Sequence, residues 1–241
     1  MKEQWCIATL DGEYLARMEN VLDLYASEED PENPIWSFDE RPCVLHDDCL
    51  APLPMEPGKP KREDYTYERN GTAVTLMAYN IHTGERRVEV RERRTANDYA
   101  EFMKALVDSQ PQATTIRIIE DNLNTHKDGS FYTRFHGAEA RRLSKKIEHI
   151  YTPKHASWLN IIEIEFSVLT RQCLDRRIAS LEELRKEILA WVEKRNALGV
   201  RVEWQFTTPK ARLTFQKAYR GICPENPHSS LDANGGWKLS I

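Results

Sequence analysis

The chain has 241 residues, of which 40% are hydrophobic and 30% are charged, and its formal net charge is −4. This composition is typical of a globular protein and excludes both a disordered chain and a fibrous one. No apolar run approaches the roughly 18 residues that a membrane span needs, and the amino terminus lacks the basic and then apolar pattern of a signal peptide. We therefore expect a cytoplasmic protein with one sizeable core.

The net charge conceals two parts of opposite sign. Residues 1–56 carry 14 acidic and 3 basic side chains, whereas the remainder carries 24 acidic and 31 basic ones. Basic clusters of this kind suit the phosphates of a nucleic acid, although solvated helix and strand faces explain most charge runs. The five cysteines are odd in number and scattered, so they indicate neither a disulfide framework nor a zinc site.

In chain order, apolar residues at helical spacing predict a first helix over residues 13–26. An acidic turn follows, and the run Ile35-Trp36-Ser37-Phe38 then predicts a short buried strand whose carboxyl end carries Asp39. Four prolines between residues 52 and 60 predict a stiff, extended loop that reaches Arg62. The strand that begins at Ile35 is therefore expected to end at Asp39.

Beyond this loop the sequence alternates between strand and helix signals. The turn His82-Thr83-Gly84 separates the strands of a hairpin, Thr95 or Asn97 caps a helix, and the β-branched run 114–119 predicts a strand that delivers Asp121. The expected elements here are strands at 72–80, 86–91, 114–119 and 147–151, and helices at 99–107, 130–146, 159–174 and 181–196.

The order of these elements predicts an α/β fold in which helices cover both faces of a mixed sheet. Reactive groups in open α/β sheets gather at the carboxyl ends of central strands, where Asp39 and Asp121 are expected. A third carboxylate on a nearby helix would complete a cluster that needs a cation, and carboxylate oxygens favour Mg²⁺ or Mn²⁺.

The stretch 159–167 supplies that third acid. At 3.6 residues per turn, Asn160, Glu163 and Ser167 share one polar helix face, whereas Glu165 points about 200° away. Glu163 is therefore the better candidate ligand. From the residues alone, an amphipathic helix with two incidental glutamates is an equally good interpretation.

Three short motifs in this order resemble those of a known family. They are Phe38-Asp39-Glu40, Asp121-Asn122-Leu123-Asn124-Thr125-His126 and Leu159-Asn160-Ile161-Ile162-Glu163. Together they are similar to the DDE transposases of bacterial insertion sequences related to the mariner superfamily, in the insertion-sequence 630 group, over about residues 14–219. The resemblance implies an RNase H-like catalytic core.

The resemblance also implies roles for the three acids. Asp39, Asp121 and Glu163 would hold two Mg²⁺ or Mn²⁺ ions, with Asp39 bridging them, for DNA strand cleavage and strand transfer by in-line phosphoryl transfer. The neighbours expected to support these acids are Asn122, His126 and Asn160. Asn122 would steady Asp121, and His126 would orient a phosphate or a water molecule, although a surface or capping histidine is nearly as good an interpretation.

Basic blocks outside the three motifs also agree with the family and are expected to contact DNA or a partner subunit, with a stiff loop and solvated helix faces as the alternatives. The candidate DNA-binding residues are Lys59, Lys61, Arg62, Lys154, His155, Arg171, Arg176 and Arg177. The implied partners are double-stranded DNA and a second copy of the chain, as a homodimer on DNA. Two residues depart from the family pattern: Glu120 stands where an apolar residue is usual, and Trp158 replaces an acidic or prolyl neighbour.

We divide the chain into a linker helix (1–30), a catalytic core (31–178), a helical continuation of the core (179–220) and a tail (221–241). Relatives carry a helix-turn-helix region before the catalytic half, and no stretch before Asp39 has room for one. We expect that region to be encoded separately or lost, so that this chain alone binds DNA with little preference for sequence.

Two alternatives to a transposase stay open. A nuclease of the same fold would cut DNA and never join it, and a decayed remnant would only bind DNA or a partner protein. The three intact acids argue against decay.

Overall fold

A five-stranded mixed sheet forms the centre of the computed structural model, which describes residues 10–223, 229–231 and 237–239. The strands are β1 (Ile35–Asp48), β2 (Tyr67–Asn80), β3 (Arg86–Arg91), β4 (Ile116–Glu120) and β5 (Ile147–Tyr151). Their order is β3-β2-β1-β4-β5, antiparallel from β3 to β1 and parallel from β1 to β5. The predicted mixed sheet is confirmed, and β1 and β4 are neighbours within it.

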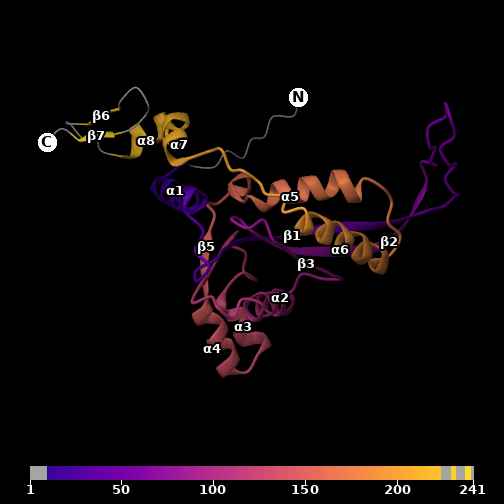
Figure 1. Ribbon diagram of the computed structural model, residues 1–241, viewed down its shortest axis with the longest axis horizontal. Coiled ribbons are helices and arrows are strands. Elements are labelled where there is room, and N and C mark those ends of the chain that lie inside the picture. Colours follow the sequence, from indigo (N-terminus) through magenta and orange to yellow (C-terminus); the bar gives the residue numbers. More distant parts are fainter. Residues whose placement is uncertain (1–9, 224–228, 232–236, 240–241) are drawn as a thin grey trace.

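Helices cover both faces of this sheet (Figure 1). One face packs against α2 (Ala96–Asp108), α3 (Asp128–Arg134) and α4 (Gly137–Lys146), and the other packs against α5 (Ile162–Leu169) and α6 (Leu181–Ala197). The remaining helices are α1 (Gly12–Ala26), α7 (Thr208–Thr214) and α8 (Gln216–Ile222). A separate two-stranded sheet pairs β6 (Ser229–Leu231) with β7 (Trp237–Leu239).

Side-chain alternation along β1 decides which groups face which helices. Phe38 packs in the core beneath α2, whereas Ile35 packs in the core beneath α5. Because successive side chains of a strand point to opposite faces, Asp39 faces α5 and Glu40 faces α2. Two acids that are adjacent in the sequence therefore lie in different environments.

The strand β1 is longer than predicted and does not end at Asp39. It pairs with β2 as far as Asp48, and the backbone bridges Leu53–Arg62 and Glu56–Lys59 continue the ribbon toward its tip. Residues 52–62 therefore form the end of a projecting arm instead of a single extended loop (Figure 1). Prolines and acids are tolerated in this arm because it lies beyond the rest of the sheet and is exposed to solvent.

Two predicted helices are divided in the structure. The stretch 130–146 forms α3 and α4, and the stretch 159–174 consists of a 3₁₀ turn (Ser157–Leu159), α5 and a π-helical turn (Thr170–Leu174). The cap of α2 is Thr95, whose hydroxyl accepts from the Asp98 N–H while the Asp98 carboxylate accepts from the Thr95 N–H. Neither α7 nor α8 has an individually predicted counterpart in the sequence.

The helix α1 packs as part of this folded unit. Its apolar face contacts α7 and the residues before α5, and Arg212 donates two hydrogen bonds to Glu19 at 2.7 and 2.9 Å. The Tyr25 hydroxyl donates to the Leu159 carbonyl at 2.7 Å and accepts from the Ile161 N–H at 3.0 Å. The segment predicted to be a linker therefore fixes the backbone just before α5.

A buried ion pair ties α5 to the sheet. Arg86 donates to both carboxylate oxygens of Glu165 at 2.7 and 2.8 Å, and both side chains are fully buried. Arg195 donates a third hydrogen bond to Glu165 at 3.0 Å. Glu165 is therefore not an incidental glutamate, because it fixes the rotation of α5 about its own axis while Glu163 on the same helix is exposed.

Glu165→Gln should lower the free energy of unfolding by about 3–5 kcal/mol, because Arg86 and Arg195 would keep buried charges without a counterion. Urea denaturation measures this loss. Arg17→Gln is the matched control, since its ion pair with Glu13 is largely exposed and should contribute less than about 0.5 kcal/mol. Equal effects of the two substitutions would contradict the role given to Glu165.

Candidate active site

The pairing of β1 with β4 brings Asp39 and Asp121 to equivalent positions. The last parallel pair joins Ser37 to Ile119, and each aspartate comes two residues later in the chain. Two residues along a strand return a side chain to the same face, so Asp39 follows Ser37 on the side of α5, and Asp121 comes directly after the last residue of β4. Asp39 lies inside β1, which continues to Asp48. It nevertheless lies beyond the last residue of β1 that pairs with β4, which agrees with its predicted place at the carboxyl end of a central strand.

Asp39 is half-buried and is surrounded by negative charge. Its carboxylate accepts a hydrogen bond from the Glu40 N–H at 2.8 Å. Burial, together with the charges of Glu40, Asp121 and Glu163, raises the pKa of Asp39 to about 7, against the opposing effect of that hydrogen bond. Asp39 therefore lies within the electrostatic influence of both other predicted ligands.

Asn160 connects Glu163 to the strand that carries Asp39. Its amide nitrogen donates to the Phe38 carbonyl at 3.1 Å, its amide oxygen accepts from the Ser37 hydroxyl, and its own carbonyl accepts from the Glu163 N–H at 3.1 Å. The prediction that Asn160 shares a polar helix face with Glu163 is wrong, because α5 begins after Asn160 and this side chain is buried against β1. It links the start of α5 to the backbone next to Asp39.

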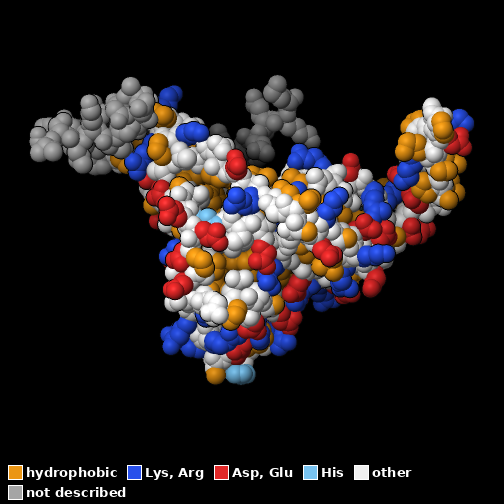
Figure 2. Space-filling model, in the orientation of Figure 1, with side chains coloured by type: hydrophobic (Ala, Val, Ile, Leu, Met, Phe, Trp, Pro, Cys, Tyr) orange, Lys and Arg blue, Asp and Glu red, His pale blue; other side chains and the backbone are white. Residues whose placement is uncertain are grey.

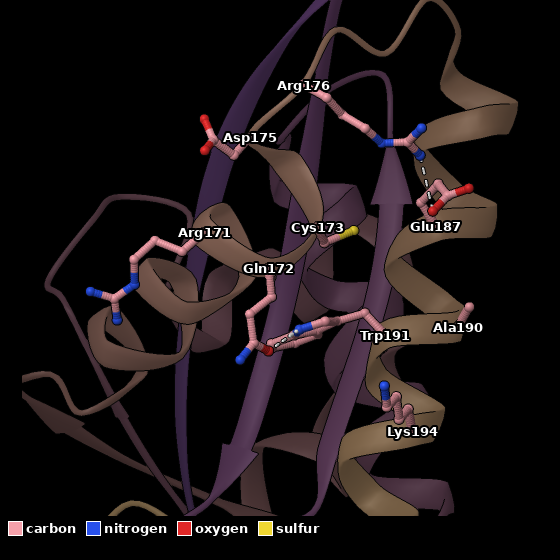
Figure 3. A pocket seen from close by; sticks show the side chains of 9 residues that line it. All are labelled: Arg171, Gln172, Cys173, Asp175, Arg176, Glu187, Ala190, Trp191 and Lys194. Carbon is pink, nitrogen blue, oxygen red and sulfur yellow. Dashed lines mark hydrogen bonds and ion pairs between the residues drawn. The ribbon is translucent and has the colours of Figure 1, made fainter. Parts of the chain in front are cut away.

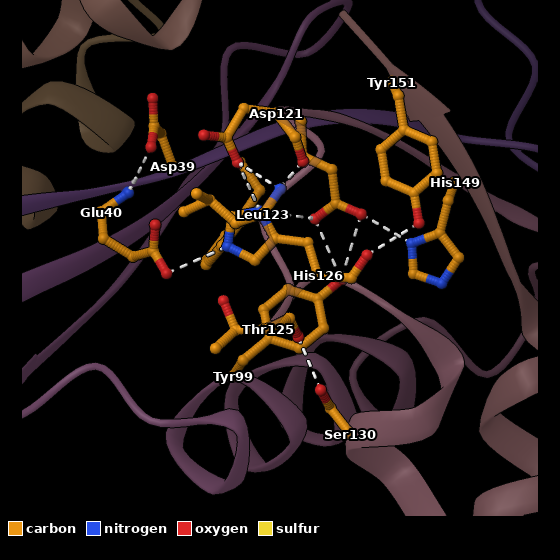
Figure 4. Close-up of polar contacts among 12 residues, drawn as sticks. Asp39, Glu40, Tyr99, Asp121, Leu123, Thr125, His126, Ser130, His149 and Tyr151 are labelled. Carbon is orange, nitrogen blue, oxygen red and sulfur yellow. Dashed lines mark hydrogen bonds and ion pairs between the residues drawn. The ribbon is translucent and has the colours of Figure 1, made fainter.

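His126 is buried between Glu40 and Asp121 (Figure 4). Its Nε2 lies 3.0 Å from Glu40 Oε1, and its Nδ1 lies 2.8 Å from Asp121 Oδ1. Burial disfavours the charged ring, but hydrogen bonds with Asp121 and Glu40 and the charge of Glu120 raise the pKa of His126 to about 11. The interpretation as a surface or capping histidine is wrong, and both ring nitrogens are engaged within the protein.

The groups that hold Asp121 differ from those predicted. Asn122 is exposed, whereas Asp121 accepts a hydrogen bond from the Leu123 N–H at 3.3 Å in addition to its contact with His126. The steadying role predicted for Asn122 therefore belongs to His126.

A second buried acid, Glu120, ends β4. The Tyr99 hydroxyl donates to it at 2.9 Å, and His149 Nδ1 lies 2.6 Å from its carboxylate. Like Glu40, it occupies the face of its strand that carries the apolar core beneath α2. A charge in such a core needs a partner. Side-chain alternation along β1 and β4 identifies Glu40 and Glu120 as buried acids, and the structure pairs them with His126 and His149.

A family profile described as DDE superfamily endonuclease matches residues 34–185, a range that includes Asp39, Asp121 and Glu163. The chain belongs to the DDE superfamily endonucleases. No curated protein sequence matches it.

Solved structures similar to this DDE endonuclease include three complexes of one transposase. The Mos1 transposase paired-end complex with left transposon end has a TM-score of 0.53 and 15% identity, and the match covers 83% of this chain and 62% of that chain. The Mos1 strand transfer complex has a TM-score of 0.53, 14% identity and coverages of 92% and 65%. The Mos1 mariner paired end complex with Mn has a TM-score of 0.50, 14% identity and coverages of 92% and 66%.

At these identities the likeness establishes the fold alone, and it confirms the predicted RNase H-like sheet with helices on both faces. The chain matches less than two thirds of the length of the Mos1 chains. None of the helices in the described part of the chain is both long and apolar enough to span a membrane.

The acids of this DDE endonuclease do not form a preassembled metal site. Among the described residues, no group of three or more His, Cys, Asp or Glu side chains is arranged to hold a metal ion. The three predicted ligands are therefore not preassembled, although the charges of Asp121 and Glu163 both reach Asp39. His126 holds one oxygen of Asp121, and gathering three like charges closer together without a cation would be costly.

The donor chemistry nevertheless fits a hard divalent cation. Asp39 is enclosed, its neighbours Asp121 and Glu163 are carboxylates, and within residues 10–223 no Lys or Arg forms an ion pair with any of the three. A half-buried cluster of like charges is costly unless a cation neutralises it. Asp39, Asp121 and Glu163 would provide oxygen ligands for that cation.

Three of the basic residues predicted to bind DNA lie on the arm. Lys59 and Lys61 form exposed ion pairs with glutamates of the arm at 3.0 and 2.5 Å, whereas Arg62 is exposed. Lys154 and His155 are exposed in the loop after β5, where His155 has a φ of 61°. These five residues are accessible to a ligand in solution.

The three arginines that follow α5 differ in their availability. Arg177 donates to Asp48 at 2.5 Å and to two backbone carbonyls at the base of the arm. Its guanidinium therefore stabilises the base of the arm. Arg176 pairs with Glu187 at 3.0 Å. Arg171 is exposed and forms no ion pair with any described residue. It is the best placed of the three to bind an anion.

The charge of His126 makes a pH-dependent contribution to stability. Its pKa is raised in the folded protein, so this contribution is complete below the ordinary value of about 6.5 and is lost as the pH rises toward about 11. His126→Gln should therefore cost most stability at low pH, and the cost should shrink by at most about 1.4 kcal/mol for each pH unit above 6.5. Urea denaturation between about pH 6 and pH 9 measures the difference. A difference that stays constant over this range would indicate a neutral His126.

Proposed function

We propose that this chain is the catalytic part of a mariner-related DNA transposase, in which Asp39, Asp121 and Glu163 hold two Mg²⁺ or Mn²⁺ ions. The observation that carries the proposal is the equivalent position of the two aspartates on neighbouring parallel strands, with Glu163 tied to one of these strands through Asn160. Membership of the DDE superfamily endonucleases supports a reaction at DNA. Mos1, whose fold is similar, forms a paired end complex with Mn. Assignment to the insertion-sequence 630 group is part of the same proposal.

Each side chain of the proposed site would have a distinct role. When bound, two divalent ions supply activation of the attacking oxygen and neutralise charge on the leaving oxygen. Asp39, Asp121 and Glu163 would hold these ions, and the pKa of Asp39 responds to the charges of both other acids. His126 holds one oxygen of Asp121 and leaves the other for an ion. No side chain is required as a nucleophile.

The proposed substrate is double-stranded DNA, and the proposed functional unit is a pair of chains. The excess of basic residues after residue 56 supports a phosphate backbone as ligand. Exposed apolar side chains on the arm support a second copy of the chain as the partner. Leu53, Met55 and Tyr65 are 55%, 76% and 88% exposed. Figure 2 shows hydrophobic side chains gathered on this arm, and exposed apolar patches mark interaction sites. Light scattering of the chain with and without DNA measures this assembly.

Sequence-specific recognition of DNA ends is proposed to come from a separately encoded helix-turn-helix half. A gel-shift comparison of terminal-repeat and scrambled duplexes tests it, since preference for the repeat by this chain alone would contradict it.

Glu163→Gln should reduce Mg²⁺-dependent DNA strand cleavage by about 10³-fold or more, because loss of a ligand removes several kcal/mol of transition-state stabilisation. Glu163 is exposed and forms no ion pair with any described residue, so the substitution should leave the fold intact. Glu193→Gln, at an exposed glutamate of α6, is the control and should keep full activity. Equal activity of the two variants would show that Glu163 is not a ligand.

The same cleavage assay with pre-nicked DNA separates a transposase from its alternatives. Joining of strands at a DNA 3′-hydroxyl supports a transposase. Cleavage without joining indicates a nuclease of this fold, and DNA binding with neither reaction indicates a decayed remnant.

Asp39→Asn should abolish cleavage and yet stabilise the metal-free protein at alkaline pH. The raised pKa of Asp39 means that its charged form destabilises the fold progressively as the pH rises from about 4 through about 7. An uncharged amide removes this cost, so the free energy of unfolding should rise by about 1–3 kcal/mol at about pH 8. Urea denaturation in the presence of EDTA provides the comparison, and a destabilised variant would argue against repulsion among the acids.

A further inference from the structure

A cleft of about 460 Å³ lies between the π-helical turn Thr170–Leu174 and α6 (Figure 3). Trp191 of α6 forms part of its wall, and the rim carries polar side chains from both elements. The ion pair between Arg176 and Glu187 closes one end at a distance of 3.0 Å. The other end is polar and open, and it is distinct from the three acids and their supports.

Two cations at the open end are free. Arg171 and Lys194 are exposed, and neither forms an ion pair within the described part of the chain. Figure 3 places the acid Asp175 on the side of Arg176, away from Lys194. The open end of the cleft is therefore positively charged.

Gln172 adds a fixed hydrogen-bond donor between these cations. The Trp191 indole N–H donates to Gln172 Oε1 at 2.9 Å, and Trp191 is only 8% exposed. This bond determines the orientation of the amide, so the nitrogen of Gln172 faces away from the indole and can donate (Figure 3). Arg171 and Lys194 lie on opposite sides of this amide in Figure 3, and the Arg171 guanidinium is directed away from the cleft, so the three donors form one polar rim that suits an extended anion.

The cleft is connected to the candidate active site along α5. Glu163, Ser167 and Arg171 are exposed at intervals of four residues, so they follow one side of the helix. At about 1.5 Å per residue, Arg171 lies roughly 12 Å beyond Glu163, which corresponds to about three or four nucleotides of one DNA strand. The turn that carries Arg171 and Gln172 is π-helical, a rare geometry that is frequent at functional sites.

We propose that Arg171, Gln172 and Lys194 form a phosphate site that holds the backbone of a DNA strand a few nucleotides from the reacting phosphate. This rests on the proposed function, because it requires DNA to follow α5 away from Glu163. The site binds a phosphodiester and contacts no base, so its contribution is independent of sequence and sensitive to salt. Arg176, which is paired within the protein, takes no part in it.

The double variant Arg171→Gln, Lys194→Gln tests the site by binding alone. Fluorescence anisotropy of a labelled duplex of about 30 base pairs, in EDTA and over a range of salt concentrations, requires neither metal nor catalysis. The double variant should bind about tenfold more weakly. The slope of log K against log salt concentration should fall by about one for each DNA phosphate that the variant no longer neutralises.

The matched control is Lys186→Gln, Arg220→Gln, which removes the same charges at exposed positions outside the cleft and should leave both quantities unchanged. Thermal melting followed by circular dichroism confirms that all variants are folded. An unchanged salt slope in the cleft variant would overturn the phosphate site and leave the proposed function standing. Failure of the unsubstituted chain to bind any duplex would overturn both.

A protein partner in the cleft is the remaining outcome. If the cleft substitutions leave the salt slope unchanged but alter the mass found by light scattering, the cleft is a protein interface and the proposal is wrong. Cys173 lines the same cleft and reports its occupancy. Duplex DNA should slow the alkylation of Cys173, measured by peptide mass spectrometry, whereas the exposed Cys223 should stay reactive. Alkylation of Cys173 that DNA does not slow would contradict the site.

Discussion

Electrostatic repulsion around Asp39 is the constraint on which the rest of the structure depends. Burial and the charges of Glu40, Asp121 and Glu163 raise the pKa of Asp39 to about 7, so folding gathers negative charge that His126 offsets in part and that no Lys or Arg of the described chain pairs with at Asp39. Such an arrangement costs stability and persists only where the surrounding structure enforces it. This opposition between stability and chemistry is common at active sites, and a divalent cation would relieve it.

Contacts on both sides of the sheet enforce the arrangement. The parallel register of β1 and β4 places the two aspartates at the same level, and Asn160 links the start of α5 to the backbone beside Asp39. From the α2 side of the sheet, where its ring packs against Phe38 and Tyr99, His126 contacts both Glu40 and Asp121. The buried ion pair between Arg86 of β3 and Glu165 fixes the orientation of α5 relative to the sheet. The acids are therefore held by the backbone register and by buried partners, while their own carboxylates keep oxygens available to ligands.

The mixed sheet and the positions of Asp39 and Asp121 beyond the parallel pairing could be predicted from the sequence, because each aspartate follows a strand signal of its own. Their supports could not. Glu40 and His126 are 86 residues apart and Asn160 is 122 residues from Phe38, so local periodicity carries no information about either contact. Periodicity placed Asn160 on a helical face, whereas its hydrogen bonds to β1 delay the start of α5. The arm was missed for the same reason, since strand pairing is non-local. Applying side-chain alternation to Glu40 and Glu120 would have identified both as buried acids in need of partners.

Diffraction from crystals of the protein grown with Mn²⁺, recorded at the manganese absorption edge, tests the two-metal site most directly. Two anomalous peaks about 3.5–4 Å apart are expected among Asp39, Asp121 and Glu163, with Asp39 in contact with both. His126 should remain on the outer oxygen of Asp121. Manganese bound elsewhere on the chain, or a single ion without contact to Asp39, would contradict the proposal that these three acids form the catalytic centre.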